Sequence, residues 1–245
     1  LDDINIAELA THTAGFDRDG GYEALVFEPG TTWSYSDAGA NWLADMLTVT
    51  FGQDLRSLLF ARVFSHLGIT SADLTWRLNS YRDRTINGIT RRELGSGISA
   101  NVDAMGRIGY LYLRDGNWNG LPILPPGYAT QVRSPLREVV GLPVHLEENY
   151  PNASDHYGVL WWTNADGTLP DVPRDAYWSW GLSDSWIIVI PSLDIVAARA
   201  GGPVRTLPGL NYGNIAPFIT PIVAAVTDSS TVSVPNVVGL TQVAA

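Results

Sequence analysis

The sequence predicts a mixed α/β (α+β) fold in which an antiparallel sheet is flanked by helices. Amphipathic helical spacing dominates the first half of the chain. Four β-rich runs then follow one another at 157–163, 176–180, 185–190 and 195–200. An apolar helical pattern returns at 215–226. Helices, a strand meander and a covering helix in this order are typical of the class.

The helices are expected from the spacing of their apolar residues. Residues 37–50 repeat apolar side chains at i, i+3, i+4 and i+7, and Asp37 is a candidate N-cap. A less regular version of the pattern predicts helices at 4–9, 55–64 and 101–114.

The third strand has a pattern of its own. It is apolar at every position from Trp186 to Ile190, so we expect both of its faces to be covered. Residues 191–194 supply the turn to the next strand. Between 115 and 156, frequent Pro and Gly predict loops with short helical pieces.

Composition excludes several kinds of chemistry. The 245 residues carry a net charge of −10, which argues against a nucleic-acid partner, because such proteins present a basic face. All 15 basic residues are Arg, and the chain has no Cys, so neither a thiol nucleophile nor a Schiff-base lysine exists in it. The four His residues lack metal-ligand spacing, and no cofactor is implied. No apolar run approaches the ~18 residues that span a membrane.

We expect one domain over residues 1–227, a linker at 228–233 and the start of a second module at 234–245. Residues 228–231, Asp-Ser-Ser-Thr, have the composition of a linker. The chain starts without Met in a helix-like segment, so we expect the domain to be incomplete at its N-terminus.

Three segments carry family motifs. The first, at 6–16, reads IAELATHTAGF; the second, at 27–47, reads FEPGTTWSYSDAGANWLADML; the third, at 177–200, reads YWSWGLSDSWIIVIPSLDIVAARA. In this order they resemble the LLTHTSG, PGxxxxYSNxGY and third-motif segments of the serine β-lactamase and penicillin-recognising family, in its class C-like branch. The tail at 234–245 resembles the opening of a PASTA repeat, a module of cell-wall-associated proteins.

The resemblance implies a β-lactamase/transpeptidase-like fold and acyl transfer on an ester, amide or peptide, of the esterase, D-aminopeptidase, carboxypeptidase or β-lactamase type. In that family a Ser-x-x-Lys motif supplies the nucleophile and a lysine that helps to activate it. The motif lies upstream of the LLTHTSG segment, and this chain does not contain it. We therefore expect the intact protein to be a serine hydrolase and this chain alone to be inactive.

Two residues of the second motif are candidate catalytic residues. Tyr35 matches the family's proton-transfer tyrosine, and Asp37 stands where the family has Asn. A carboxylate beside Tyr35 would raise the pKa of the tyrosine and disfavour tyrosinate unless a cation offsets it. The lysine of the Ser-x-x-Lys motif would have been that cation.

The third motif supplies the candidate oxyanion and substrate-binding residues: Ser179, Trp180, Gly181 and Leu182. The first three stand at the family's Lys-Thr-Gly or His-x-Gly, and the backbone N–H of Leu182 would stabilise the oxyanion. Ser179 carries no charge for a substrate carboxylate, which favours an ester, amide or peptide over a β-lactam. We expect Arg199 to form a surface ion pair and His12 to be structural.

These departures support a second hypothesis, a non-catalytic module that keeps the fold and binds peptidoglycan or another cell-wall partner. An upstream Ser-x-x-Lys would favour the enzyme. The partners expected for the enzyme are small-molecule, peptide or ester substrates. The resemblance also implies an extracytoplasmic location, in the periplasm, at the cell surface or secreted.

Overall fold

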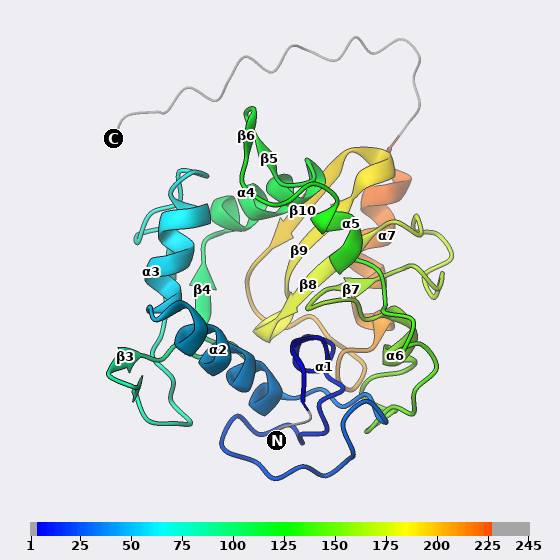
Figure 1. Cartoon of the computed structure of the whole chain (residues 1–245). Coiled ribbons are helices and arrows are strands. Elements are labelled where there is room, and N and C mark those ends of the chain that lie inside the picture. The colour runs from blue at the N-terminus through cyan, green and yellow to red at the C-terminus, as the bar shows by residue number, and fades with distance from the viewer. Residues whose placement is uncertain (1–3, 227–245) are drawn as a thin grey trace.

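The computed structural model describes residues 4–226, and its main sheet has four antiparallel strands. They lie in the order β10–β9–β8–β7, so neighbours in the chain are neighbours in the sheet. Figure 1 shows the sheet across from a helical half that contains α2 and α3. The strands are β7 (Trp162–Thr163), β8 (Tyr177–Gly181), β9 (Ser185–Ile190) and β10 (Ile195–Arg199). The mixed α/β fold predicted from the sequence is confirmed.

The remaining elements are short apart from α2 and α4. The α-helices within residues 4–226 are α1 (Ile6–Ala10), α2 (Asp37–Phe51), α3 (Leu55–Leu59) with a π-helical turn (Phe60–Phe64), α4 (Val102–Leu113), α5 (Tyr128–Val132), α6 (Ala153–His156) and α7 (Ala216–Ala224). Three two-stranded ladders join β1 (Leu74–Trp76) to β4 (Ile98–Ala100), β2 (Thr85–Ile86) to β3 (Ile89–Thr90), and β5 (Asn117–Trp118) to β6 (Leu121–Pro122).

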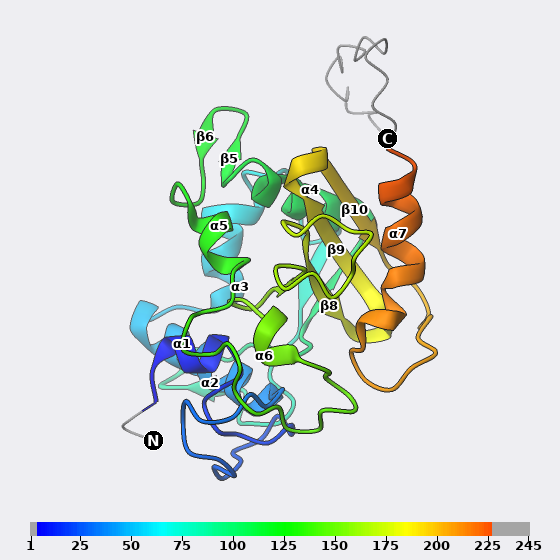
Figure 2. The ribbon, with the colours of Figure 1, turned by 90° about the vertical axis from the view of Figure 1, so that its right-hand side faces the viewer.

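One face of the sheet is covered by α7, which Figure 2 shows lying along the strands. Trp186 and Ile188 of β9 are completely buried and share a core with Ile215 and Ile219. Trp186 also pairs across the strands with Trp180 of β8. This core is rich in tryptophan, since Trp33, Trp162, Trp178 and Trp180 are buried in it together with Trp186.

The other face of β9 lies against α4. Gly109 makes this close approach possible, because a Cβ there would lie 2.6 Å from Val196 and 2.8 Å from Ile187. Val189, on the same face, is buried with Trp161. β9 is therefore covered on both sides, as its continuous apolar sequence predicts.

The start of α2 differs from the prediction. Ser36, not Asp37, is the N-cap: its backbone is extended, and its Oγ accepts a hydrogen bond from the N–H of Gly39 at 3.0 Å. Asp37 is the first helical residue. The candidate cap was thus placed one residue too late, and the side chain of Asp37 is left for another role.

The first expected strand is also shorter than predicted. Of residues 157–163, only Trp162 and Thr163 pair with β8. The chain turns back before them: Gly158 donates to the carbonyl of Trp161, and Leu160 has a φ of +61°. Such a turn interrupts the extended backbone that a strand requires. The pairing of β1 with β4 was not predicted, because each has three residues and they lie far apart in sequence.

Within residues 4–226, no helix combines the length and the apolar character that crossing a membrane demands. The expected linker at 228–233 and the PASTA-like segment at 234–245 lie outside the described residues. Both stay predictions.

A buried ion cluster fixes α2 to the segment that follows β1. Asp45 of α2 accepts hydrogen bonds from Arg82 at 2.7 Å and from Arg91 at 2.6 and 2.8 Å. All three side chains are almost fully buried. Arg82 also donates to the carbonyls of Gly21 and Ala38, so α2, the segment after β1 and the loop at Gly21 meet at this cluster.

We expect Asp45→Asn to lower the free energy of unfolding by about 3–5 kcal/mol, because it leaves two buried guanidinium groups without a counter-charge. The matched control is Asp103→Asn, which breaks an exposed i,i+4 pair with Arg107 and should cost under about 1 kcal/mol. Urea unfolding of both variants measures the difference. Equal losses in the two variants would contradict the role assigned to Asp45.

Candidate active site

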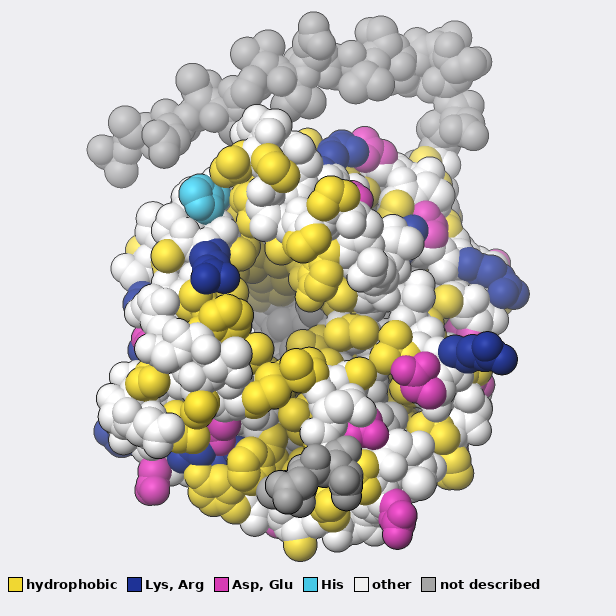
Figure 3. All heavy atoms as spheres, viewed as in Figure 1, with side chains coloured by type: hydrophobic (Ala, Val, Ile, Leu, Met, Phe, Trp, Pro, Cys, Tyr) yellow, Lys and Arg dark blue, Asp and Glu magenta, His cyan; other side chains and the backbone are white. Residues whose placement is uncertain are grey.

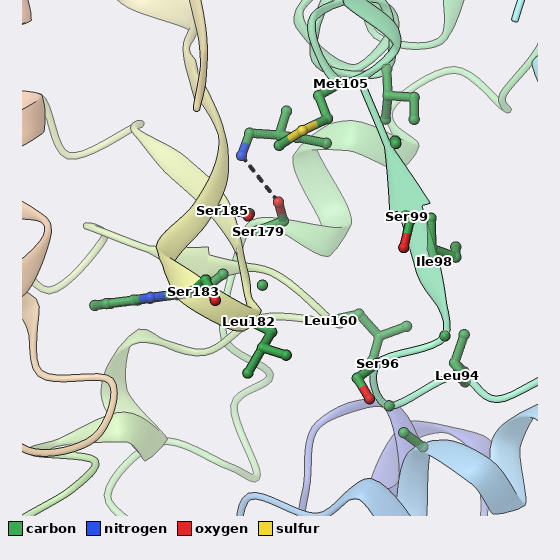
Figure 4. A pocket seen from close by; sticks show the side chains of 18 of the residues that line it. Leu94, Ser96, Ile98, Ser99, Met105, Leu160, Ser179, Leu182, Ser183 and Ser185 are labelled. Atoms are coloured by element: carbon green, nitrogen blue, oxygen red, sulfur yellow. Dashed lines mark hydrogen bonds between the residues drawn. The ribbon is translucent and has the colours of Figure 1, made fainter. Parts of the chain in front are cut away.

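A cavity of about 680 Å³ opens between the helical half and the sheet. Figure 3 shows it as a hollow with hydrophobic side chains around its mouth. The residues at the end of β8 and the start of β9 form one wall, and the segment that leads into β4 forms the other (Figure 4). All six site residues predicted from the sequence line this cavity: Tyr35, Asp37, Ser179, Trp180, Gly181 and Leu182.

Tyr35 lies just before α2 in an aromatic cluster. Its ring stacks on Tyr150, with centroids 5.3 Å apart and an interplanar angle of 11°, and lies 4.6 Å from the ring of His12. Burial raises the pKa of Tyr35 well above its ordinary value, and Asp37 raises it further, while Arg18 opposes the shift. Tyr35 is therefore a neutral phenol at pH 7, able to donate its proton but poor as a base.

Asp37 is half-buried at the first position of α2. Its carboxylate lies against Gly95, where an added Cβ would be 2.7 Å from Oδ1. Burial raises the pKa of Asp37, Arg18 lowers it and Glu93 raises it, and the net shift is upward. Among residues 4–226, no side chain or N–H donates a hydrogen bond to this carboxylate, and none pairs with it as an ion.

His12 is structural, as expected. It follows α1 with a φ of +60°, and its Nδ1 accepts the N–H of Ser36 at 3.2 Å. Burial lowers its pKa to about 3, so the ring is neutral at pH 7. His12 therefore brings no charge to the cavity, and its Nδ1 is already engaged.

The third motif ends strand β8 at the mouth of the cavity. The Oγ of Ser179 accepts the N–H of Ile187 at 3.1 Å, the bond drawn in Figure 4. Trp180 is buried, and its Nε1 donates to Asp184 at 3.1 Å. Leu182 follows Gly181 with 81% of its surface exposed, so its side chain borders the opening.

A buried carboxylate holds the turn between β8 and β9. Asp184 accepts hydrogen bonds from Trp180, from the N–H groups of Val204 and Arg205, and from the guanidinium of Arg205. Burial alone would raise the pKa of Asp184, but these donors lower it below its ordinary value. The turn that carries Leu182 is thus tied to the segment after β10.

Arg199 differs from the prediction, which gave it a surface ion pair. It donates instead to the backbone carbonyls of Ser183, Asp184 and Gly202, and it lies 5.1 Å over the ring of Trp186. These carbonyls need a donor because Ser183 and Asp184 have φ of +59° and +57°, outside regular pairing. Arg199 supports the turn and adds no charge at the cavity.

The comparisons identify the family. The model of the Beta-lactamase family matches residues 1–200. The chain belongs to the beta-lactamase family. An uncharacterized protein of Alkalihalophilus pseudofirmus is 24% identical over 226 residues, which are 86% of this chain and 64% of that protein. The chain thus spans less than two thirds of the length of this relative.

Solved structures agree on the fold. A beta-lactamase from Mycobacterium bovis superposes with a TM-score of 0.62 at 16% identity, covering 90% of this chain and 71% of its own. Simvastatin synthase from Aspergillus terreus superposes with a TM-score of 0.58 at 17% identity, covering 80% of this chain and 61% of its own. At these identities the likeness shows the fold, and the resemblance to the family predicted from the motifs is confirmed.

Ser96 and Ser34 each contact a candidate general base in this member of the beta-lactamase family. Ser96 lines the cavity and donates to Glu93 at 2.7 Å, but Arg77 and Ser80 also bind that carboxylate and its pKa is lowered, which makes it a weak base. Ser34 contacts His145 at 3.3 Å, yet Ser34 is buried and does not line the cavity.

Potential metal ligands are not clustered among residues 4–226. In the part of the chain that the structure describes, no three His, Asp or Glu side chains lie close enough together to hold a metal ion.

Gly95 and Asp184 were not identified from the sequence as residues of the site. Neither a glycine that lies beside a distant carboxylate nor a carboxylate buried in a turn produces a local sequence pattern.

The lowered pKa of Asp184 predicts an acid-dependent contribution to stability. A carboxyl whose pKa is lower folded than unfolded stabilises the protein above its ordinary pKa, and this contribution is lost as the pH falls through the folded pKa. We expect Asp184→Asn to be less stable by about 1–3 kcal/mol near pH 6, with a smaller difference near pH 3.

Urea unfolding at a series of pH values measures this difference. Asp171→Asn, at an exposed position, removes the same charge and should leave the pH profile of the wild type almost unchanged. A constant gap between wild type and Asp184→Asn from pH 6 to pH 3 would contradict the prediction.

Proposed function

We propose that this chain is the part of a serine acyl hydrolase that supplies the proton-transfer tyrosine and the oxyanion-binding strand. The observation that supports it is the meeting of the second and third motifs at one cavity, although they lie far apart in the sequence. The nucleophile would come from a Ser-x-x-Lys segment outside this chain. The absence of Lys from the chain supports that division, because the Ser-x-x-Lys motif requires one.

In this proposal the serine hydroxyl adds to the substrate carbonyl and passes its proton to the neighbouring lysine amine. The N–H of Leu182 binds the oxyanion that forms. Tyr35, a neutral phenol, stands between the lysine and the leaving group and relays a proton to the departing alkoxide or amine. Water then attacks the acyl-enzyme, and the serine recovers its proton as the acid product leaves.

The lining of the cavity supports a substrate without a carboxylate next to the reacting carbonyl. None of the lining residues is an Arg, His12 is neutral and Ser179 carries no charge. A carboxylate buried there would lack a counter-ion. We therefore favour a neutral or cationic ester, amide or peptide.

The alternative is a non-catalytic module that binds peptidoglycan, for which Ser179 and Asp37 at the motif positions are the supporting observations. A cell-wall partner also fits an extracytoplasmic location and the PASTA-like segment at 234–245, which stay proposals. The presence or absence of an upstream Ser-x-x-Lys segment distinguishes the two functions.

The first test is labelling with a fluorophosphonate probe. We expect no stoichiometric label on residues 1–245 alone, because the chain has no Lys that could activate a serine as the Ser-x-x-Lys motif does. We expect one label on the chain extended by its natural upstream coding sequence, at the serine of the Ser-x-x-Lys motif. Rapid labelling of a serine within residues 1–245, or no label on the extended protein, would overturn the proposed function.

The second test is the role of Tyr35. In the extended protein, Tyr35→Phe should slow acylation by p-nitrophenyl butyrate by about 10²–10⁴-fold, since it removes the proton relay. Tyr81→Phe is the control, because it removes an exposed phenol outside the cavity. Stopped-flow release of p-nitrophenol measures both. Equal rates for Tyr35→Phe and wild type would remove Tyr35 from the mechanism.

A further inference from the structure

We propose that Asp37 is the receptor for an alkylammonium group that enters the cavity. This inference deepens the proposed function and rests on it for the position of the reacting groups. It starts from the environment of this half-buried carboxylate, which lines the cavity and has no hydrogen-bond or ion-pair partner among residues 4–226.

Each of the three buried carboxylates among residues 4–226 pairs with arginine, and the half-buried Asp166 pairs with His156. Asp45 binds Arg82 and Arg91, Glu93 binds Arg77, and Asp184 binds Arg205; the less buried Asp54 binds Arg92. Asp37 lines the cavity and has no such partner among residues 4–226. A cation from outside these residues would give Asp37 the counter-charge that the paired acids already have.

The position of Asp37 in α2 does not account for its charge. Ser36 already caps the helix, so the carboxylate is not needed there. The helix N-terminus and Arg18 both favour the ionised form, yet burial still raises the pKa of Asp37. Arg18 and Arg77 act on the carboxylate without forming an ion pair with it, so a cation in direct contact would stabilise it further.

The rest of the cavity fits an ammonium group on a hydrocarbon stem. An ammonium has three donors, and Asp37, Tyr35 and Ser179 offer carboxylate, phenol and hydroxyl oxygens on the lining. The wall opposite the hairpin is apolar, with Leu94, Ile98 and Met105 labelled in Figure 4 along with Leu160. A metal ion fits less well, because the described residues gather no set of three ligands there.

Two sources present this same chemistry. One is the lysine of the proposed Ser-x-x-Lys segment, in the ammonium form that it takes once it has accepted the serine proton, and the other is a protonated amine on the substrate. In either case a cation at Asp37 would oppose the effect of the carboxylate on Tyr35, whose pKa Asp37 raises.

The isolated chain allows a direct binding test with hexylammonium, hexanoate and 1-hexanol at equal ionic strength. Trp162 and Trp180 line the cavity and provide the fluorescence signal. We expect hexylammonium to bind at least about tenfold more tightly than either other probe, as a charge-assisted hydrogen bond to a carboxylate requires. Equal affinities for the three probes would overturn the proposal.

Asp37→Asn keeps the shape and removes the charge, and it should weaken hexylammonium binding by about tenfold while leaving 1-hexanol unchanged. Asp19→Asn is the matched control, because this acid lies close enough to affect Asp37 but does not line the cavity. Equal weakening by the two variants would indicate that hexylammonium responds to the overall negative charge near the cavity and does not bind at Asp37. The comparison of probes on the wild type decides the matter even if Asp37→Asn does not fold.

The extended protein distinguishes the two sources. If the lysine occupies Asp37, hexylammonium should bind only after Lys→Met in the Ser-x-x-Lys segment. If the substrate supplies the amine, hexylammonium should bind the extended protein and the p-nitrophenyl ester of 4-aminobutyrate should be hydrolysed faster than that of butyrate. Loss of labelling by the fluorophosphonate would reject the proposed function, whereas hexylammonium binding to residues 1–245 tests Asp37 independently.

Discussion

The burial of β9 on both faces is the constraint on which the rest of the structure depends. Trp186 and Ile188 fill the side facing α7, and Ile187 meets α4 where Gly109 removes the obstacle of a side chain. A strand held in this way cannot slide by one residue without moving its apolar set to the wrong face. The β8–β9 hairpin is therefore fixed, and with it the position of the backbone at Gly181 and Leu182.

Arginine organises the polar interior of the molecule, both around α2 and beside the sheet. The chain has no Lys, and the three buried carboxylates of residues 4–226, Asp45, Glu93 and Asp184, are each paired with a planar guanidinium, which can bind two oxygens and several carbonyls at once. Arg82 joins the carboxylate of Asp45 to two backbone carbonyls, and Arg199 joins three carbonyls at the turn after β8. These contacts hold loops in place where regular hydrogen bonding ends.

The electrostatics of the cavity are set by Asp37, the lining carboxylate that no arginine of residues 4–226 pairs with. Asp37 is an acid without a partner among the described residues, and Tyr35 beside it is kept neutral by burial. His12 accepts a hydrogen bond from the N–H of Ser36 and is neutral because of its burial, so it does not offset the charge of Asp37. A cavity of this kind disfavours anions and is completed by a cation, which connects the lining of the site to the chemistry proposed for it.

The sequence by itself determined the helices at 37–50 and 101–114, the meander of strands, and the family, because apolar periodicity and motif order are local properties. It also indicated Tyr35 and the Ser179–Leu182 strand end. It misplaced the cap of α2, since Ser36 and Asp37 are both good caps. It also misjudged the environment of Arg199, since the carbonyls that this half-buried arginine binds are brought to it by the tertiary structure. Only the tertiary structure showed that Asp37 faces Gly95 in a shared cavity without an arginine, because pairing of buried charges depends on segments that are distant in the chain.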